Sequence, residues 1–533
     1  MSHYDIIIRN AKIVDGTGSP WYRGDIGIKG DRIARIGRLG RAAADETLDA
    51  AGLVVTPGFI DMHSHSDLFV LESGTVPAKL RQGITTELLG QDGISAAPLP
   101  EEYIDRWKGN LAGLDGTPAI EWDWRDVDSY LNKIEAARPE CNYAYLVPHG
   151  NLRMQVIGLD DKPATREEIE EMARLLRRGL DQGACGLSSG LIYLPCMYGD
   201  YREIEALCAV AAEYGVPFIV HQRSEGDEIL ESMDELLAVA ERTGVHLHFS
   251  HFKVCGRMNW HKTAELLAKL DQARASGIEV TFDQYPYTAG STMLSAILPP
   301  WAHDGGTPAM LERLKSAEWR RRMAAEMAAG LPGWDSMYRW AGPEGIVITS
   351  VATEANAPCV GRTLADIAAA RGTDPIEAAF DLILEERNAV GMIDFVMDES
   401  SVSRIMRHPA GTICTDGLLG GEPHPRTYGA FPKVLGRYVR EMRLFSLEEA
   451  VRRMTSQPAR IIGFTDRGVI REGMKADLVV FDDRMIADTA TYEKPRSYPA
   501  GIRWVIVNGR VAVDGDRERR AMAGEVLRRT YDH

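Results

Sequence analysis

The chain has no long apolar run, no cluster of basic residues and no paired-cysteine motif. A membrane-spanning helix needs roughly 18 consecutive apolar residues, so we expect no membrane contact. The formal net charge is −16, which argues against a nucleic-acid partner. The 7 cysteines are an odd number without a CxxC pair, and the first residues lack the pattern of a secretory signal. Both features favour a reducing, cytoplasmic compartment.

The two ends of the chain share a pattern that the middle lacks. The chain has 533 residues, enough for one large domain and a smaller module. Short strand candidates cluster at both ends, with hairpin turns at Lys29–Asp31 and Asn508–Gly509. Neither end has enough strands for a core of its own. We therefore expect residues 1–56 and 470–533 to pair into one small β-domain.

Residues 57–469 alternate between short apolar runs and helical segments that stop at glycine. The apolar runs are typical of parallel strands buried on both faces. The candidates are Val55–His65, Ile84–Gly90, Tyr143–His149, Ala184–Tyr193, Pro217–Gln222, His246–Lys253, Glu279–Tyr285 and Gly411–Asp416. The pattern predicts an α/β protein with a (β/α)8 TIM-like barrel, whose active site lies at the carboxyl ends of the strands. Residues 290–409 break the rhythm and are predicted to be an insertion.

Metal-ligating side chains occur at several of these strand ends. His63 and His65 are two residues apart, so on a strand they would point to one face. His221 and His251 end the fifth and sixth strands, and Asp416 ends the eighth. Each residue alone could be an ordinary buried histidine or part of an Asp-Gly turn. Together they predict a site for one or two zinc ions, or for another divalent metal.

The chain resembles the amidohydrolase superfamily and, within it, the N-acyl-D-amino-acid deacylase (D-aminoacylase) family. The motifs that carry the resemblance extend along nearly the whole chain: Gly58–Asp67, Gly83–Thr86, Gly93–Ser95, Gly183–Tyr193, Ser250–Lys253, Asp283–Thr292, His424–Arg426 and Leu447–Ala459. The resemblance implies an enzyme that hydrolyses linear amide bonds, with an N-acyl amino acid as its small-molecule substrate. It also implies that Asp416 is both a metal ligand and the general acid–base.

The same resemblance implies a place for the carboxylate of the substrate. Lys253 and Arg426 are the candidate cations, since an arginine fork matches a carboxylate. Tyr285 is the expected tyrosine partner, with Tyr193 nearby. His149, at the end of the third strand, is a further candidate for substrate contact. For Lys253 and Arg426 the alternative is a structural salt bridge.

One motif departs from the family pattern. After the second strand the family has Gly-Asn-Cys-Gly, and its cysteine is a metal ligand. This chain has Gly90-Gln-Asp-Gly93, which places Asp92 at that position. A carboxylate is a harder ligand than a thiolate and can bridge two ions, so Asp92 is a candidate ligand of a binuclear site. The alternative is that Asp92 only orders an Asp-Gly turn.

Two other functions compete with deacylation of N-acyl-D-amino acids. Hydantoinases and dihydroorotases resemble one another in using a carboxylated lysine on the fourth strand, and Ala184–Tyr193 has no lysine. This argues against, without excluding, a hydrolase of cyclic amides, carbamates or other amides. A non-catalytic scaffold protein is disfavoured because the set of ligands is complete. The sequence leaves the acyl group, the side chain, the number of metals and the oligomeric state open.

Overall fold

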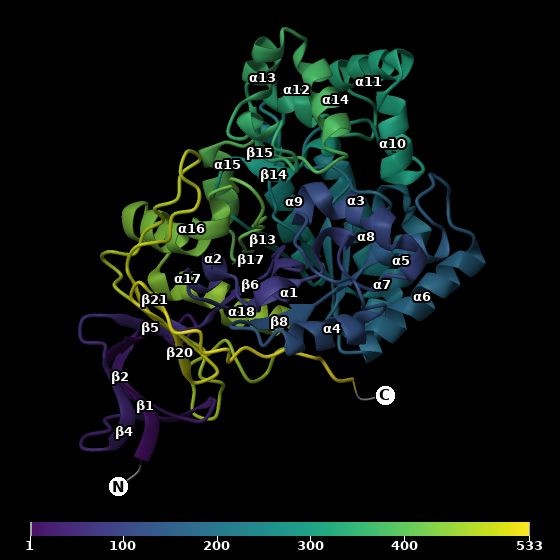
Figure 1. Cartoon of the computed structure of the whole chain (residues 1–533). Coiled ribbons are helices and arrows are strands. Elements are labelled where there is room, and N and C mark those ends of the chain that lie inside the picture. Colours follow the sequence, from purple (N-terminus) through teal and green to yellow (C-terminus); the bar gives the residue numbers. More distant parts are fainter. Residues whose placement is uncertain (1–2, 532–533) are drawn as a thin grey trace.

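A computed structural model describes residues 3–531. It consists of a barrel, a sheet built from both chain ends and an insertion above the barrel (Figure 1). The predicted fold class is confirmed. Within the described residues no helix is both long and apolar enough to span a membrane. The 7 cysteines are all buried and free of disulfides.

The barrel is a ring of parallel strands in which each strand pairs with the next. In chain order the strands are β6 (Phe59–Asp61), β7 (Ile84–Leu89), β8 (Asn142–Tyr145) continued by β9 (Val147–Pro148), β10 (Leu187–Gly190), β11 (Pro217–His221), β12 (His246–Phe249), β13 (Val280–Gln284) and β17 (Gly411–Ile413). The ring closes where Ser64 pairs with Gly417. There the Asp416 amide also donates a hydrogen bond to the His63 carbonyl at 2.9 Å. The segments that follow β6 and β17 therefore lie side by side.

Helices surround the barrel, and several of them bury one apolar face. They are α1 (Phe69–Ser73), α2 (Pro77–Leu80), α3 (Ile104–Asp115), α4 (Val127–Ala136), α5 (His149–Val156), α6 (Arg166–Asp181), α7 (Tyr201–Glu213), α8 (Ile229–Thr243), α9 (Thr263–Ala275), α15 (Glu399–Met406), α16 (Arg426–Lys433), α17 (Leu447–Met454) and α18 (Ser456–Ile462). Helix α6 begins with a capping box between Thr165 and Glu168. Its buried residues Met172, Leu176 and Leu180 recur every four positions and so share one face.

The two chain ends form one sheet in the order β21-β20-β19-β18-β5-β1-β2-β3, with β4 beside β1. The strands are β1 (His3–Ile13), β2 (Tyr22–Lys29), β3 (Arg32–Gly37), β4 (Ala43–Asp49), β5 (Val54–Pro57), β18 (Leu478–Phe481), β19 (Ile502–Val507), β20 (Arg510–Asp514) and β21 (Arg517–Glu518). Strands β5 and β18 join the ends, with Val55 opposite Val480. This sheet lies below the barrel in Figure 1.

The prediction of one strand over Val55–His65 was wrong. Strand β5 belongs to the terminal sheet and β6 to the barrel, and Gly58 separates them. The Gly58 amide donates to the Asp477 carbonyl at 2.7 Å, while the next amide donates to Gly83 on the barrel side. A Cβ atom at Gly58 would lie 2.1 Å from the Thr85 hydroxyl, so only glycine fits where the chain passes between the two sheets.

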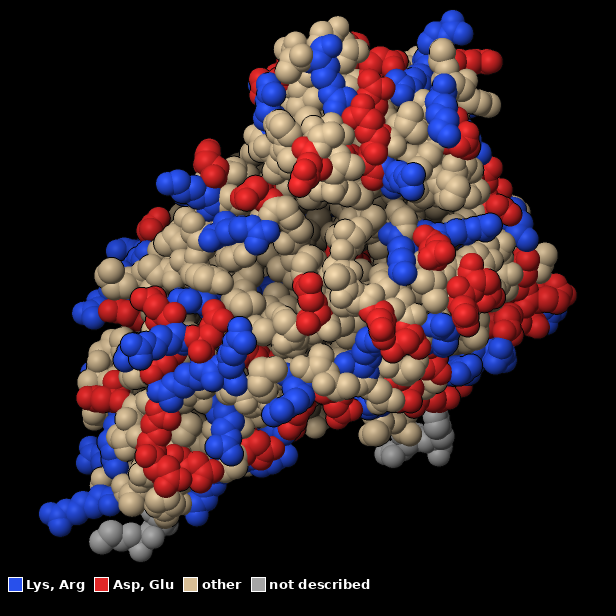
Figure 2. All heavy atoms as spheres, viewed as in Figure 1, with Lys and Arg blue, Asp and Glu red and all other residues tan. Residues whose placement is uncertain are grey.

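The insertion has its own apolar core and stands above the barrel (Figure 1). Its elements are β14 (Gly290–Met293), β15 (Ile346–Ser350), β16 (Gly391–Asp394), α10 (Gly306–Leu314), α11 (Ala317–Ala329), α12 (Met337–Ala341), α13 (Leu364–Arg371) and α14 (Pro375–Glu385). The predicted range 290–409 also includes α15, which instead packs beside α9, where Thr263 donates to Ser401 at 3.1 Å. Figure 2 shows the face hollowed where the insertion meets the barrel, with charges of both signs interspersed.

Candidate metal centre and substrate cavity

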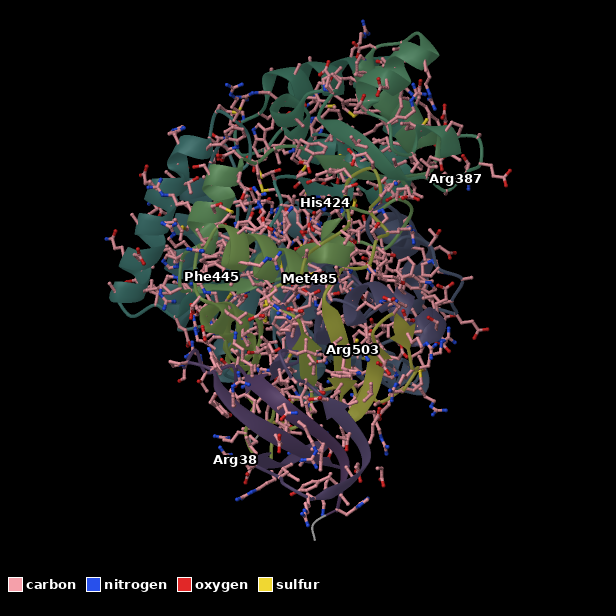
Figure 3. The ribbon with its side chains drawn as sticks, turned by 90° about the vertical axis from the view of Figure 1, so that its left-hand side faces the viewer. Arg38, Arg387, His424, Phe445, Met485 and Arg503 are labelled. Atoms are coloured by element: carbon pink, nitrogen blue, oxygen red, sulfur yellow. The ribbon has the colours of Figure 1, made fainter. Side chains whose placement is uncertain are left out.

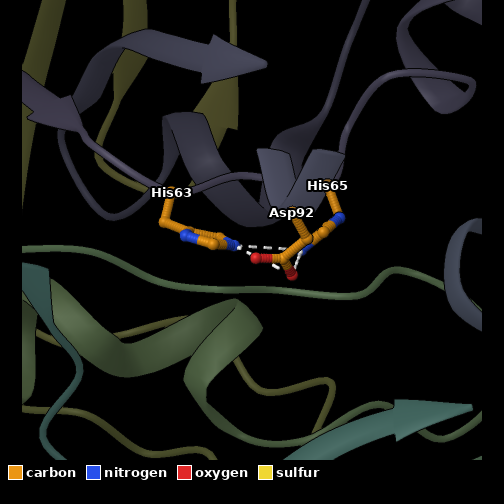
Figure 4. Close-up of side chains that lie close together, drawn as sticks. All are labelled: His63, His65 and Asp92. Carbon is orange, nitrogen blue, oxygen red and sulfur yellow. Dashed lines mark hydrogen bonds and ion pairs between the residues drawn. The ribbon is translucent and has the colours of Figure 1, made fainter. Parts of the chain in front are cut away.

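His63 and His65 lie just beyond β6, with their rings directed at one point (Figure 4). Their Nε2 atoms are 3.2 Å apart, and both side chains are buried. The strand ends at Asp61, so a loop rather than the pleat of a strand sets their direction. Asp61 holds this loop, because its Oδ1 accepts from the His63 amide at 3.3 Å and from the Thr415 amide at 2.8 Å.

Asp92 lies between this pair of histidines and the two from β11 and β12. Its Oδ2 atom is 3.5 Å from Nε2 of both His63 and His65. Its Oδ1 atom is 3.6 Å from Nε2 of His251 and has no hydrogen-bond partner among the described residues. The backbone of Asp92 is left-handed, with φ 55°, a conformation that aspartate tolerates better than most residues. The turn therefore directs the carboxylate at the histidines.

His221 and His251 form the second pair. His221 Nδ1 is 3.0 Å from His251 Nε2, and the buried His221 Nε2 has no hydrogen-bond partner within the described chain. Burial lowers the pKa of His221 to about 4, so this imidazole is neutral at pH 7. A neutral imidazole is the form that binds metals.

These residues fit one or two divalent ions. Two groups of potential ligand atoms each lie within 4.8 Å of one another, His63 with His65 and Asp92, and Asp92 with His221 and His251. Zinc–nitrogen bonds of about 2 Å in tetrahedral geometry place two ligating nitrogens roughly 3.3 Å apart, close to the separation in both pairs. A shared ion would also provide a partner for the unpaired Asp92 Oδ1 atom.

Asp416 faces the first pair from the end of β17. Its Oδ1 atom is 3.4 Å from His65 Nε2 and 3.6 Å from His63 Nε2. Its Oδ2 atom is 2.9 Å from Arg426 Nη1. Burial raises the pKa of the carboxyl, but the charges of Arg426, His63 and His251 outweigh it and hold that pKa well below its usual range. Asp416 is therefore an ionised carboxylate directed at the histidines.

Arg426 and Tyr285 present unpaired donors on the same cavity. Arg426 is fully buried at the start of α16, and its guanidinium lies 4.5 Å from the centre of the Tyr285 ring. Its Nη2 donates to the Ser291 carbonyl at 3.0 Å. The Arg426 Nε and the Tyr285 hydroxyl have no hydrogen-bond partner among the described residues. His424, labelled in Figure 3, accepts from the Arg426 amide at 2.9 Å and so fixes the start of the helix. Unpaired buried donors are costly, so this wall suits an anionic ligand.

Lys253 forms the salt bridge that the sequence left as the alternative. Its Nζ is 2.6 Å from Glu225 Oε1 and 2.6 Å from His251 Nδ1. Glu225 also lies 3.2 Å from His251 Nδ1 and 3.5 Å from His221 Nε2. Glu225 was not among the predicted residues, because its only signal in the sequence is its position four residues after His221. Its carboxylate orients both rings.

A cavity at the carboxyl ends of the barrel strands collects most of the predicted residues. It is lined by Asp92, Tyr193, His221, His251, Lys253, Tyr285, Asp416 and Arg426. The Tyr193 hydroxyl lies 2.9 Å from the Thr292 hydroxyl. His149 is not brought to this cavity. Helix α5 begins at His149, and the ring turns back to Ser189 Oγ at 2.9 Å and Glu203 Oε1 at 2.6 Å.

Two further buried groups near the histidines carried no sequence signal. Asp115, at the end of α3, lies 3.5 Å from His65 Nδ1, on the side of the ring away from Asp92. Lys79 of α2 donates to Asp61 Oδ2 and Ser64 Oγ, both at 2.9 Å, and to the Thr415 hydroxyl. Both residues support the segments that carry the ligands.

The amidohydrolase family model matches residues 46–513, and the chain belongs to this family. An N-acyl-D-glutamate deacylase from Alcaligenes xylosoxydans xylosoxydans is 38% identical over 98% of this chain and 96% of its own length. The structure of an N-acyl-D-glutamate deacylase from Bordetella bronchiseptica, complexed with zinc and a phosphonate mimic of the tetrahedral intermediate, is 38% identical. The two structures align with a TM-score of 0.85, and the alignment covers 99% of this chain and 100% of the Bordetella chain.

A D-aminoacylase structure whose binuclear metal centre has been studied is 34% identical, with a TM-score of 0.83. The structural alignment covers 99% of this chain and 100% of the D-aminoacylase chain. The resemblance inferred from the motifs is thereby confirmed.

Replacing Asp92 with asparagine tests whether it is a ligand. We expect Asp92→Asn to lose at least half of the bound metal, because asparagine lacks the negative charge that would hold a divalent ion. Asparagine tolerates the same left-handed turn, so a purely structural role predicts wild-type metal content. Elemental analysis of both proteins makes the comparison. Asp45→Asn, an exposed position on β4, serves as the matched control.

Proposed function

We propose that this protein is a zinc-dependent hydrolase that deacylates N-acyl-D-amino acids, releasing a D-amino acid and a carboxylate. The observation that carries the proposal is the placement of two histidine pairs and Asp92 beside the unpaired donors of Arg426 and Tyr285. The activities named for the similar proteins, N-acyl-D-glutamate deacylase and D-aminoacylase, support the same reaction class. The similar structure from Bordetella bronchiseptica contains zinc, which makes zinc the first metal to test, with one or two ions per chain.

The side chains divide the reaction between them. His63, His65, His221, His251 and Asp92 would hold the metal, which when bound activates water and polarises the amide carbonyl. Asp416 is the ionised carboxylate beside this position, so it takes a proton from the attacking water and returns it to the leaving amine. Arg426 and Tyr285 hold the carboxylate of the substrate.

A hydrolysis screen on metal-analysed protein tests the proposal. Matched N-acetyl D- and L-amino acids are the substrates, with hydantoin and dihydrouracil as cyclic-amide controls. We expect the D-enantiomers to be cleaved, and a chelator to abolish activity that added zinc then restores. Preference for the L-enantiomers or for the cyclic amides would overturn the proposal, as would activity that persists without metal.

Recognition of the carboxylate is tested by removing Arg426. We expect Arg426→Ala to raise KM for an N-acetyl-D-amino acid by about 10–100-fold, since a hydrogen bond to a charged group contributes roughly 1.5–3 kcal/mol. The amide-capped analogue lacks the carboxylate, so its KM should change far less. Because Arg426 also contacts Asp416, kcat is expected to fall for both substrates. Arg437→Ala, a half-exposed arginine paired with Glu399, is the control. An equal rise in KM for both substrates would count against the assignment.

A further inference from the structure

A second cavity opens from the substrate cavity. The two share Tyr193, His221, Glu225 and the insertion residues Met337 and Trp340. Beyond this junction most of the wall is apolar: Ile192, Leu194, Met197, Met293, Leu298 and Trp334. The wall comes largely from the segment after β10 and from the insertion.

No lysine or arginine lines this second cavity, all of whose wall lies in the described part of the chain. Besides the Tyr193 phenol, its titratable groups are His221, Glu225, His303 and Asp335. Glu225 already pairs with Lys253. Asp335 accepts from the Glu225 amide at 2.6 Å and from the Ser224 hydroxyl at 2.8 Å, so it holds the loop after β11. Burial lowers the pKa of His303 to about 4, which leaves that ring uncharged at pH 7. Burial raises the pKa of Asp335 to about 7, so an acidic group entering this space would meet the Glu225 carboxylate, a partly protonated Asp335 and no cation of the wall.

The position of the junction relates the cavity to one part of the substrate. In the proposed function the substrate carboxylate binds at Arg426 and Tyr285 and its amide at the histidine pairs, which puts the α-carbon between them. The apolar cavity begins at His221 and Tyr193, next to that point. A separate groove meets the substrate cavity at Leu114 and Ser291. It is open and lined largely by small residues, which suits the acyl group on the far side of the amide.

Resting on the proposed function, we infer that the second cavity receives the side chain of the D-amino acid and selects apolar side chains. Leucine, methionine and phenylalanine bury apolar surface there, whereas the acidic side chains named for two similar proteins would lose water without meeting a lysine or arginine on the wall. Met197, Met293 and Met337 give the wall adaptable thioethers, so several apolar shapes should be accepted. We expect kcat/KM for substrates with apolar side chains to exceed that for acidic ones by about 10–200-fold or more. This is the range that a difference of one methylene produces in an apolar pocket.

The test compares N-acetyl derivatives of D-leucine, D-methionine, D-phenylalanine, D-glutamate and D-lysine on the zinc-loaded protein. We expect the apolar substrates to exceed the glutamate and lysine derivatives by at least about 10-fold in kcat/KM. A preference for glutamate or lysine overturns the inference. Changing acetyl to a longer acyl group should leave the order of side chains unchanged, and a reversed order would assign the cavity to the acyl group instead.

A charge placed on the wall gives an independent readout. Met197 is only half-buried, so Met197→Lys can be tolerated, and it should shift the glutamate-to-leucine ratio of kcat/KM at least about 10-fold toward glutamate. Met485→Lys, on the exposed surface labelled in Figure 3, is the matched control and should leave the ratio unchanged. An unchanged ratio in Met197→Lys would overturn the assignment.

Binding is measured in parallel through the thermal shift that each N-acetyl-D-amino acid produces. Tighter binding of the leucine derivative without any hydrolysis would refute the proposed function alone. Tighter binding of the glutamate derivative would refute the apolar cavity whether or not hydrolysis occurs.

Discussion

Replacing Asp416 with asparagine is expected to lower kcat by about 10²–10⁴-fold, the scale of general acid–base catalysis by one side chain. Asparagine has the same shape but cannot take a proton from water or return it to the leaving amine. The four histidines and Asp92 remain, so most of the metal should be retained. Steady-state kinetics and elemental analysis on the same preparation measure the two quantities.

Asp394→Asn is the matched control for charge alone. Asp394 lines the same cavity from the insertion, and Lys253 and Arg426 both act on its charge. A much smaller loss of kcat in Asp394→Asn would place the effect of Asp416 in its position beside His63 and His65. Equal losses would mean that any negative charge in the cavity suffices. A variant Asp416→Asn within a few-fold of the wild-type kcat would remove Asp416 from the mechanism.

The barrel was predictable because its strands are short apolar runs that end in glycine or in polar ligands. Strand β11, for example, is buried along Pro217–His221 and ends at a ligand, as the pattern indicated. The terminal sheet was predictable in part. Strand β4 (Ala43–Asp49) was missed, since only Leu48 in it is buried and its remaining side chains show no alternation of apolar residues. A strand that contributes so little to the core leaves almost no trace in hydrophobicity.

His63 and His65 do lie together as predicted, but for a different geometric reason. The spacing of His63 and His65 suggested one face of a strand, yet β6 ends at Asp61 and a loop directs the rings together. The loop depends on contacts with Thr415, more than 350 residues away. No local pattern contains that information.

Partners of the ligands were the least predictable feature of the site. Glu225 follows His221 by four residues, but its role arises from its contacts with His251 and Lys253 in the segment after β12. Asp115 reaches His65 from the end of α3, a helix whose path over the barrel no pattern in the sequence indicates. Asp92 was recognised only because it departs from a family motif. In a sequence, a single charged residue is most often an exposed surface residue. Only the tertiary structure shows which charged residues are buried beside the ligands.

The buried lysine beneath the first histidine pair leads to the second large expected effect. Lys79 is fully buried and contacts Asp61, Ser64 and Thr415, so it joins the segments after β6 and β17. Glu87 lies 3.8 Å away and adds a second buried carboxylate. We expect Lys79→Met to destabilise the protein by about 3–5 kcal/mol, because one member of a buried ion pair is removed while its partners stay charged. The melting midpoint of the metal-free protein reports this loss.

If Lys79 also positions the histidine loop, Lys79→Met should have a second measurable effect. If Lys79 sets the direction of His63 through Asp61 and Ser64, metal content should also fall, even at temperatures where the protein is fully folded. Adding Asp61→Asn to Lys79→Met removes a stranded charge, so it should recover part of the melting midpoint without recovering the metal. Lys315→Met breaks an exposed pair with Glu312, worth about 0–1 kcal/mol, and is expected to change neither quantity. Full metal occupancy in Lys79→Met, despite a lower midpoint, would show that the lysine only stabilises the closed barrel and that the histidine loop keeps its direction without it.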